Sequence, residues 1–160
     1  MNVYLAGDHA GFRLKKVLFE QLNLLGYQVS DLGPDELNPV DDYPDYVTPL
    51  ANRLADEPNA VGIVLAGSGQ GEAMCANRIH GVRAAVFYGK MSAMSALDAE
   101  GGHSEDGFDP VRLARRHNNA NLLSIGARFV SPEDANEAVR IFLETPFSGD
   151  ERHIRRLGKF

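Results

Sequence analysis

A glycine-rich segment followed by an acid carries the clearest chemical signal in the sequence. The segment reads Gly67-Ser68-Gly69-Gln70-Gly71, and Glu72 follows it directly. Glycines between a strand and a helix let backbone N–H groups approach a ligand, and the start of a helix favours negative charge. A carboxylate beside such donors can move a proton while the donors hold the oxyanion that forms. The same residues also suit a tight turn and an ordinary first-turn acid, so both interpretations stay open.

Other polar residues flank the apolar runs that are typical of strands. Asp8 and His9 follow the first run, where they can contact a ligand or form a turn in which Asp8 caps the next helix. His117 and Asn118 precede the last run, and a histidine there can exchange protons or act as a cation at a helix end. Arginine side chains bind phosphate oxygens well, although a basic tail exposed to solvent is the plainer interpretation of those near the C-terminus. The candidate arginines are Arg128, Arg152 and Arg156.

The composition is that of an ordinary folded domain and excludes several functions. The chain has 160 residues, 44% apolar and 24% charged, with a formal net charge of −6 and one cysteine, Cys75. An intrachain disulfide and a cysteine-rich zinc site are therefore excluded, and the charge argues against binding to nucleic acid or an anionic membrane. His80 and His103 have no partners at metal-ligand spacing, so we expect no metal. Residues 1–6 do not resemble a signal peptide and no apolar run could span a bilayer, which predicts a cytoplasmic protein.

Apolar runs and helical patterns alternate along the chain. Strands are expected at residues 2–6, 27–32, 61–66, 83–88 and 122–125. Helices are expected at residues 14–25, 47–54, 72–78 and 110–116, and from residue 132 onward. The alternation predicts an α/β fold of three layers, Rossmann-like (flavodoxin-like), with helices on both faces of a five-stranded parallel sheet. The expected strand order is 2-1-3-4-5, which brings Asp8 and the glycine-rich segment together at the switch point where ligands bind.

Two segments depart from this alternation. Residues 89–110 hold several glycines and acids, and we interpret them as an inserted excursion between the fourth strand and the next helix. Residues 147–160 form a basic C-terminal tail, in which a helix would place Arg152 and Arg156 on one face. No linker or repeat divides the sequence, so we expect a single domain over residues 1–160.

Several short motifs together resemble one family of enzymes. In chain order they are Gly7-Asp8-His9-Ala10-Gly11, Asp42-Tyr43-Pro44, Gly67-Ser68-Gly69-Gln70-Gly71-Glu72, Ala76-Asn77-Arg78, Arg116-His117-Asn118-Asn119, Gly126-Ala127-Arg128 and Arg152-His153-Ile154-Arg155-Arg156. Each is weak alone, but the set is similar to the type B ribose-5-phosphate isomerases, the family that includes galactose-6-phosphate isomerase subunits. Members interconvert aldose and ketose phosphates without metal or cofactor. They form homodimers whose sites draw on both subunits, so the resemblance implies a homodimer or a larger assembly such as a tetramer.

The resemblance also implies a role for each candidate residue. One subtype uses a cysteine just before the glycine-rich segment as its base, but Ala66 stands there; the other subtype uses the acid after it, here Glu72. His117 would assist opening of the sugar ring, and Ser68 with the loop amides would stabilise the enediolate. Asp8 would bind sugar hydroxyls, while His9 and the three arginines would hold the phosphate. The substrate-binding set is Asp8, His9, Tyr43, Gly67, Ser68, Gly69, Gln70, Gly71, Asn118, Arg128, Arg152 and Arg156.

Two alternatives to a ribose-5-phosphate isomerase stay open. The segment between Phe87 and His117 is longer than the family pattern, so a hexose 6-phosphate such as allose or galactose 6-phosphate remains a candidate substrate. A non-catalytic module that binds a phospho-sugar would need the arginines and the glycine-rich segment, but it would not need both Glu72 and His117. That pair for proton transfer favours an enzyme.

Overall fold

Five strands and six helices alternate in the part of the chain that the computed structural model describes, residues 1–97, 102 and 104–160. The strands are β1 (Asn2–Gly7), β2 (Gln28–Asp31), β3 (Val61–Ala66), β4 (Ala84–Phe87) and β5 (Leu122–Gly126). The helices are α1 (Phe12–Leu24), α2 (Pro44–Asp56), α3 (Gln70–Ala76), α4 (Asp109–Asn118), α5 (Pro132–Glu144) and α6 (Glu151–Leu157). Every predicted element is present with small shifts at its ends. No helix in these described ranges has the length and apolar content that a membrane span requires.

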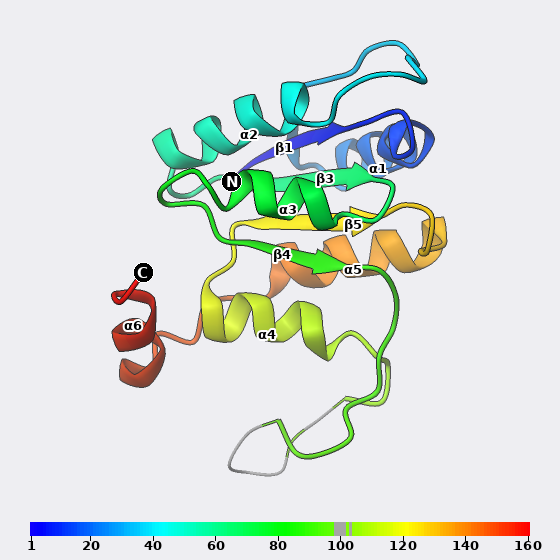
Figure 1. Ribbon diagram of the computed structural model, residues 1–160. Coiled ribbons are helices and arrows are strands. Elements are labelled where there is room, and N and C mark those ends of the chain that lie inside the picture. The colour runs from blue at the N-terminus through cyan, green and yellow to red at the C-terminus, as the bar shows by residue number, and fades with distance from the viewer. Residues whose placement is uncertain (98–101, 103) are drawn as a thin grey trace.

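The strands form one parallel sheet in the order β2-β1-β3-β5-β4 (Figure 1). The predicted α/β fold of three layers is confirmed, and so is the pairing of β1 with both β2 and β3. The predicted order of the last two strands is wrong, because β5 pairs with β3 and β4 lies at the edge of the sheet.

Burial explains why β5 is internal and β4 is an edge strand. All five residues of β5 are buried, whereas three of the four in β4 are only half-buried. On the open side of β4, the side-chain amide of Asn77 takes the place of a neighbouring strand. The N–H of Ala84 donates to Asn77 Oδ1 at 2.7 Å, and Asn77 Nδ2 donates to the carbonyl of Ala84 at 3.1 Å. These bonds satisfy the exposed backbone of the edge strand at that residue.

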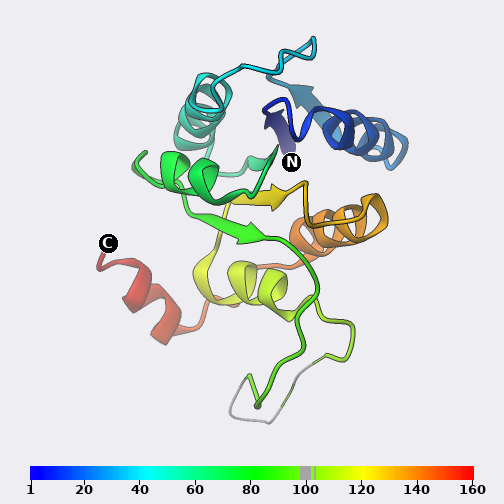
Figure 2. The same cartoon turned by 45° about the vertical axis from the view of Figure 1, so that its right-hand side comes forward.

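The helices cover both faces of the sheet and enclose two apolar cores. Helices α1, α4 and α5 pack on one face, and α2 and α3 pack on the other (Figure 2). Alternate residues of β3 serve the two cores, with Ile63 and Leu65 in the first and Val64 in the second. The chain returns from the edge strand β4 toward the middle of the sheet, and a right-handed crossover in that direction places α4 on the same face as α1.

Two glycines bring the turn after β1 against the end of β3. A Cβ atom on either Gly7 or Gly11 would overlap the carbonyl oxygen of Leu65. The N–H of Asp8 donates to that same oxygen at 3.2 Å. Because only glycine fits at positions 7 and 11, Asp8 is held beside the strand that leads into the glycine-rich segment.

The described part of the segment 89–110 is anchored to its surroundings. The N–H of Met91 donates to the carbonyl of Gly107 at 2.9 Å, and Lys90 pairs with Asp134 of α5 at 2.7 Å. Near the start of α4, Arg112 pairs with Asp106 at 2.6 Å. Residues 98–101 and 103 lie outside the described residues, so the expectations for that part of the excursion, His103 included, are not addressed by the structure.

Candidate active site

The glycine-rich segment joins β3 to α3 at the carboxyl edge of the sheet, the edge at which the strands end. Gly69 has a left-handed backbone (φ 75°), and a Cβ there would lie 3.1 Å from the carbonyl oxygen of Ser124. Ser124 Oγ donates to the carbonyl of Gly69 at 2.7 Å, which fixes the segment against β5. Ser68 is exposed, and its N–H and that of Gly69 have no acceptor within the described part of the chain. These unused donors suit an oxyanion.

Glu72 lies directly behind this segment, in the first turn of α3. Its exposed fraction is only 4%, and its Oε2 atom has no hydrogen-bond partner among the described residues. Burial raises the pKa of the Glu72 carboxyl above its ordinary value, its own backbone N–H lowers it, and the nearby Asp8 carboxylate raises it. A buried carboxylate with an unused oxygen and a raised pKa is well suited to accept a proton from a bound molecule.

Asp8 is also buried, and its turn brings it to the same edge as Glu72. Its Oδ1 atom accepts the N–H of Ala10 at 2.8 Å and that of Gly11 at 3.1 Å. The expected turn is therefore present, but the expectation that Asp8 caps the next helix is wrong, because the N-cap residue of α1 is Gly11 and no side chain caps that helix. The turn fixes the carboxylate of Asp8 in place near Glu72, so the structural interpretation and a role in binding are compatible.

His9 is held by an acid from a distant loop. Its ring Nδ1 lies 2.6 Å from Asp41 Oδ1, and its backbone N–H donates to the same oxygen at 3.1 Å. The side chain of Asp41 is 2% exposed, whereas that of His9 is 33% exposed. The ring is therefore fixed on its Nδ1 side and open to solvent elsewhere.

Tyr43 and Arg128 complete this edge from the two sides of the glycine-rich segment. A Cβ on Gly71 would lie 2.8 Å from the Tyr43 hydroxyl oxygen, so that hydroxyl covers the start of α3. A Cβ on Gly67 would lie 3.4 Å from the guanidinium carbon of Arg128. We call the residues gathered at this edge the carboxyl-edge group: Asp8, His9, Tyr43, Gly67, Ser68, Gly69, Gln70, Gly71, Glu72 and Arg128.

The remaining predicted site residues lie at the opposite, amino edge of the sheet. In Figure 1, α6 and the end of α4 lie on the side of the tails of the strand arrows, whereas the segment that leads into α3 continues from the arrowhead of β3. Hydrogen bonds agree with this placement, since Arg83, just before β4, donates through Nε to the carbonyl of Asn119 at 2.8 Å. The N–H of Ser148 donates to the carbonyl of Arg116 at 3.0 Å and ties the tail to α4. We call His117, Asn118, Arg152 and Arg156 the amino-edge group.

Within the amino-edge group, His117 stacks on a further histidine, His153. The rings of His117 and His153 lie 4.2 Å apart between centroids, with 15° between their planes. Burial lowers the pKa of His117 below its ordinary value, and the neighbouring His153 and Arg152 act in the same direction. His153 itself is buried, and its Nε2 accepts from Nε of Arg152 at 3.2 Å. His117 is therefore favoured in its neutral form, which can either give or take a proton.

The two arginines of the amino-edge group, Arg152 and Arg156, are exposed on α6, as a site for an anion requires. Arg152 approaches Asp150 at 3.7 Å, and Arg156 has no ion pair among the described residues. The helix predicted for the tail is present, and its spacing of four residues places both arginines on one face. One chain thus separates its predicted site into two groups, because a carboxyl-edge residue cannot meet an amino-edge residue across the length of the strands.

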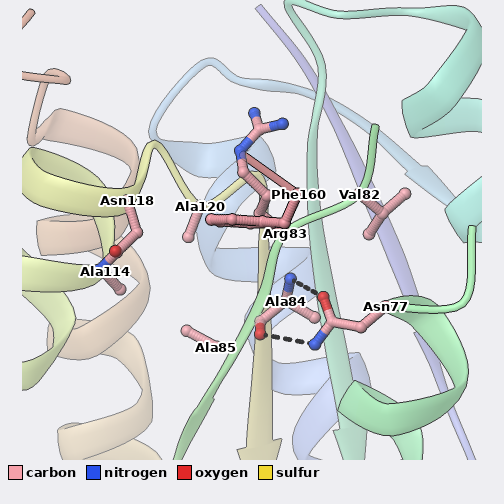
Figure 3. Close-up of a pocket in the computed structure, with 9 residues that line it drawn as sticks. All are labelled: Asn77, Val82, Arg83, Ala84, Ala85, Ala114, Asn118, Ala120 and Phe160. Carbon is pink, nitrogen blue, oxygen red and sulfur yellow. Dashed lines mark hydrogen bonds between the residues drawn. The ribbon is translucent and has the colours of Figure 1, made fainter. Parts of the chain in front are cut away.

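Two cavities in the described structure adjoin the amino-edge group. One of about 390 Å³ lies beside β4, and Figure 3 shows it between Asn77, Arg83, Asn118 and Phe160. The nine described residues that line it include no acidic side chain and no histidine, and two of the nitrogens of Arg83 already donate to carbonyls of the chain. The other, of about 240 Å³, lies between His117 and the excursion and is lined also by Ser104, Arg112 and Arg116. The excursion therefore forms a wall beside His117.

Sequence reasoning missed Asp41 and gave no separate role to His153. Asp41 lies next to the Asp42-Tyr43-Pro44 motif, but nothing in a local pattern links it to His9, from which it is 32 positions away. His153 was grouped with the basic tail, although its burial against His117 sets it apart from the exposed arginines around it. Within the described residues, no group of three His, Cys, Asp or Glu side chains is placed to hold a metal ion.

Comparison with known proteins gives matches over almost the whole chain. The family model described as Ribose/Galactose Isomerase matches residues 3–101 and 108–160. A probable ribose-5-phosphate isomerase B of Mycoplasma pneumoniae is 39% identical, over 98% of this chain and 91% of the relative. The ribose-5-phosphate isomerase B of Mycobacterium leprae is 38% identical, over 98% of this chain and 86% of the relative.

Solved structures agree with these matches. The crystal structure of ribose-5-phosphate isomerase B from Mycoplasma genitalium with bound ribulose-5-phosphate superposes with a TM-score of 0.84 and 34% identity, over 99% of this chain and 92% of that chain. The structure of the type B ribose 5-phosphate isomerase of Trypanosoma brucei superposes with a TM-score of 0.82 and 32% identity, over 99% of this chain and 95% of that chain. With a fold, a set of motifs and relatives that all agree over nearly its full length, the chain belongs to the ribose/galactose isomerase family.

Proposed function

We propose that this protein interconverts ribose 5-phosphate and ribulose 5-phosphate through an enediolate, with Glu72 as the base. The observation that carries the proposal is the state of Glu72, which is buried and has a raised pKa. Within the described residues, one of its oxygens has no hydrogen-bond partner, and the glycine-rich segment beside it has N–H groups without an acceptor. A site that only bound a phospho-sugar would gain nothing from burying an acid, since desolvation of a carboxylate costs free energy.

The reaction needs one proton to move between two neighbouring carbons. Glu72 would take the proton from C2 of the open-chain aldose, and the electrons of that C–H bond would form the C1–C2 double bond of the enediolate. The developing negative charge would fall on the oxygen at C1, where N–H groups of the glycine-rich segment and the Ser68 hydroxyl can donate to it. Glu72 would then return the proton to C1 from the same face. The proton of the C2 hydroxyl would pass to the negatively charged oxygen on C1, so that C1 becomes a primary alcohol as C2 becomes the ketone.

The amino-edge group supplies what the carboxyl-edge group lacks. Before a base can act, the sugar ring must open, which requires a proton to leave the C1 hydroxyl and another to reach the ring oxygen. A largely neutral His117 can mediate that exchange, and Arg152 and Arg156 with Arg128 and His9 can hold the phosphate. Binding of the phosphate positions the reacting carbons, which lowers the barrier to the chemical step.

We infer that a second copy of the chain brings the two groups together. His117 and Glu72 lie at opposite edges of one sheet, yet the proposed reaction needs both within reach of one sugar. In a two-fold symmetric dimer, the amino-edge group of each copy can face the carboxyl-edge group of the other. Each of the two sites would then hold one Glu72 and one His117, from different subunits.

The decisive experiment compares wild-type protein with Glu72→Gln, using ribose 5-phosphate in the presence of a chelator. We expect kcat to fall by roughly 10³-fold, within the range for loss of a general base, with phosphate binding unchanged. Glu133→Gln is the matched control, because Glu133 occupies the first turn of α5 but is exposed. In deuterated solvent, the wild-type protein should place deuterium on the carbon that receives the proton, and Glu72→Gln should not. Near-normal turnover by Glu72→Gln would refute the assignment of the base.

The same assay distinguishes the alternative functions. Turnover of allose 6-phosphate or galactose 6-phosphate in preference to ribose 5-phosphate would make the protein a hexose-phosphate isomerase with the same base. Binding of all three sugar phosphates without deuterium incorporation would identify a non-catalytic binding module.

A further inference from the structure

Asp41 makes an unusual contact for a residue of a surface loop. Both described hydrogen bonds of its side chain use Oδ1 and both join it to His9, one to the backbone N–H and one to ring Nδ1. Two contacts from one oxygen to one residue restrict the backbone position and the ring orientation of His9 together.

The burial of Asp41 shows that this contact is not incidental. Its side chain is 2% exposed, and the second carboxylate oxygen, Oδ2, is buried without a hydrogen-bond partner in the described residues. Such burial of an acid costs free energy unless the acid interacts strongly with a partner. The described side-chain partner of Asp41 is His9. The fold therefore accepts the free-energy cost of burying this carboxyl group at a position from which it orients the His9 ring.

The loop that carries Asp41 is fixed at its beginning by the core. The N–H of Gly7 donates to the carbonyl of Gly33 at 3.2 Å, and Nζ of the fully buried Lys15 donates to the carbonyl of Pro34 at 3.0 Å. At the other end the loop leads into α2. Tyr43, the residue just before that helix, places its hydroxyl against Gly71. Asp41 is therefore placed by rigid elements on both sides rather than by a free surface segment.

We propose that Asp41 is a positioning residue for His9. Its Oδ1 atom accepts the Nδ1–H of the His9 ring, and this bond presents Nε2 of the ring to the substrate. This proposal rests on the proposed function, in which His9 helps to hold the phosphate. A carboxylate on one imidazole nitrogen fixes both the tautomer and the direction of the other nitrogen. Nε2 of His9 has no hydrogen-bond partner in the described part of the chain, and the ring is one-third exposed, so Nε2 is available to a ligand.

The test uses two variants of Asp41 and one control in the same loop. Asp41→Ala removes the acceptor and should raise KM for ribose 5-phosphate by about tenfold while kcat changes less than about threefold. Asp41→Asn keeps an acceptor oxygen at the same position and should hold KM within about threefold of wild type. Glu36→Ala removes an exposed acid from the same loop and should leave both constants unchanged.

A measurement without turnover separates this proposal from the proposed function. Nitrogen-15 NMR of the histidine rings in the wild-type protein should show His9 protonated at Nδ1, and Asp41→Ala should lose that preference. Calorimetry with inorganic phosphate should show weaker binding to Asp41→Ala and not to Glu36→Ala. These results would support the role of Asp41 even if the protein failed to isomerise ribose 5-phosphate.

Either of two results would overturn the proposal. One is a wild-type spectrum in which neutral His9 carries its proton on Nε2. The other is an Asp41→Ala protein that folds and binds phosphate as tightly as wild type. If Asp41→Ala does not fold, the wild-type spectrum still decides the matter, because it requires no variant.

Discussion

The acids of the carboxyl-edge group are buried, whereas the arginines of the amino-edge group reach into solvent. Glu72 and Asp8 are almost inaccessible, and Glu72 owes its raised pKa mainly to that burial. Arg152 and Arg156 are exposed on a helix of seven residues near the end of the chain. The difference matches the two tasks that we propose for these groups. A base gains proton affinity when water is removed from it, while a cation that must capture a phosphate has to be reachable from solution.

The two groups also differ in how firmly they are held. The carboxyl-edge group rests on β1, β3 and β5, and Ser124 and Leu65 of the sheet bond directly to its loops. The amino-edge group rests on the end of α4 and on α6, which are joined by the stacked rings of His117 and His153 and by the hydrogen bond from Ser148 to Arg116. Rigid placement suits the chemical step, where small displacements of the base are costly. The phosphate can be held by longer and more adaptable side chains.

Mixing two inactive variants tests most directly whether the groups meet between copies. Glu72→Gln and His117→Asn should each lose most activity, but co-expressed chains should recover roughly a quarter of the wild-type rate if dimers form at random. Half of the dimers would then be mixed, and each mixed dimer would hold one intact site. A co-expressed pair of Glu72→Gln and Glu72→Ala provides the control, because no intact site can form. Absence of recovery in mixed dimers that are shown to form would contradict a shared site.

Removal of Arg152 or Arg156 from α6 should weaken binding rather than chemistry. Arg152→Ala and Arg156→Ala are each expected to raise KM for ribose 5-phosphate by about tenfold, or ~1.4 kcal/mol, with a smaller change in kcat. Arg155→Ala is the matched control, since Arg155 is an exposed neighbour on α6 that lies outside the amino-edge group. Steady-state kinetics on the three variants measures the effect. An unchanged KM in both Arg152→Ala and Arg156→Ala would place the phosphate elsewhere.

The influence of Asp8 on Glu72 should appear in the pH dependence of kcat/KM. Glu72 must be ionised to act as a base, so activity should fall as the pH falls through its raised pKa. Asp8 raises that pKa by its negative charge, so Asp8→Asn should move the acidic limb toward lower pH. The midpoint of the limb is the quantity to compare, because loss of a substrate contact would lower the rate at every pH. A limb that stays in place would show that burial alone sets the proton affinity of Glu72.

The smallest expected effect is a gain in stability when the buried acid is removed. An acid with a raised pKa in the folded state destabilises that state once it ionises, so the cost is absent at low pH and grows as the pH rises through the raised pKa. Glu72→Gln should therefore raise Tm by about 2–4 °C at pH 8, corresponding to ~1 kcal/mol, and by less near pH 4. Thermal unfolding at both pH values measures this, with Glu133→Gln as the control. A lower Tm at pH 8 would mean that the carboxylate makes a favourable interaction that the structure does not show.

Much of the fold and half of the candidate site could be predicted from local patterns. The apolar run of β3, the proline and acids that open α5, and the glycines around Asp8 are short-range signals, and each appears where it was expected. The strand order was wrong at β4 and β5 because the choice depends on which strand is buried on both sides. That property arises from packing and from the amide of Asn77 on Ala84, not from either strand alone.

The sequence by itself determined the types of the elements and the meeting of the loops after β1 and β3, and it offered Glu72 as either a base or an ordinary first-turn acid. These follow from periodicity, from the conformational freedom of glycine and from the short distance between an acid and the segment it follows. Only the tertiary structure decided that Glu72 is buried beside Asp8, that Asp41 holds His9, and that His117 with the α6 arginines lies at the other edge. Burial and contacts between distant residues depend on the packing of the whole chain, so no local pattern contains them.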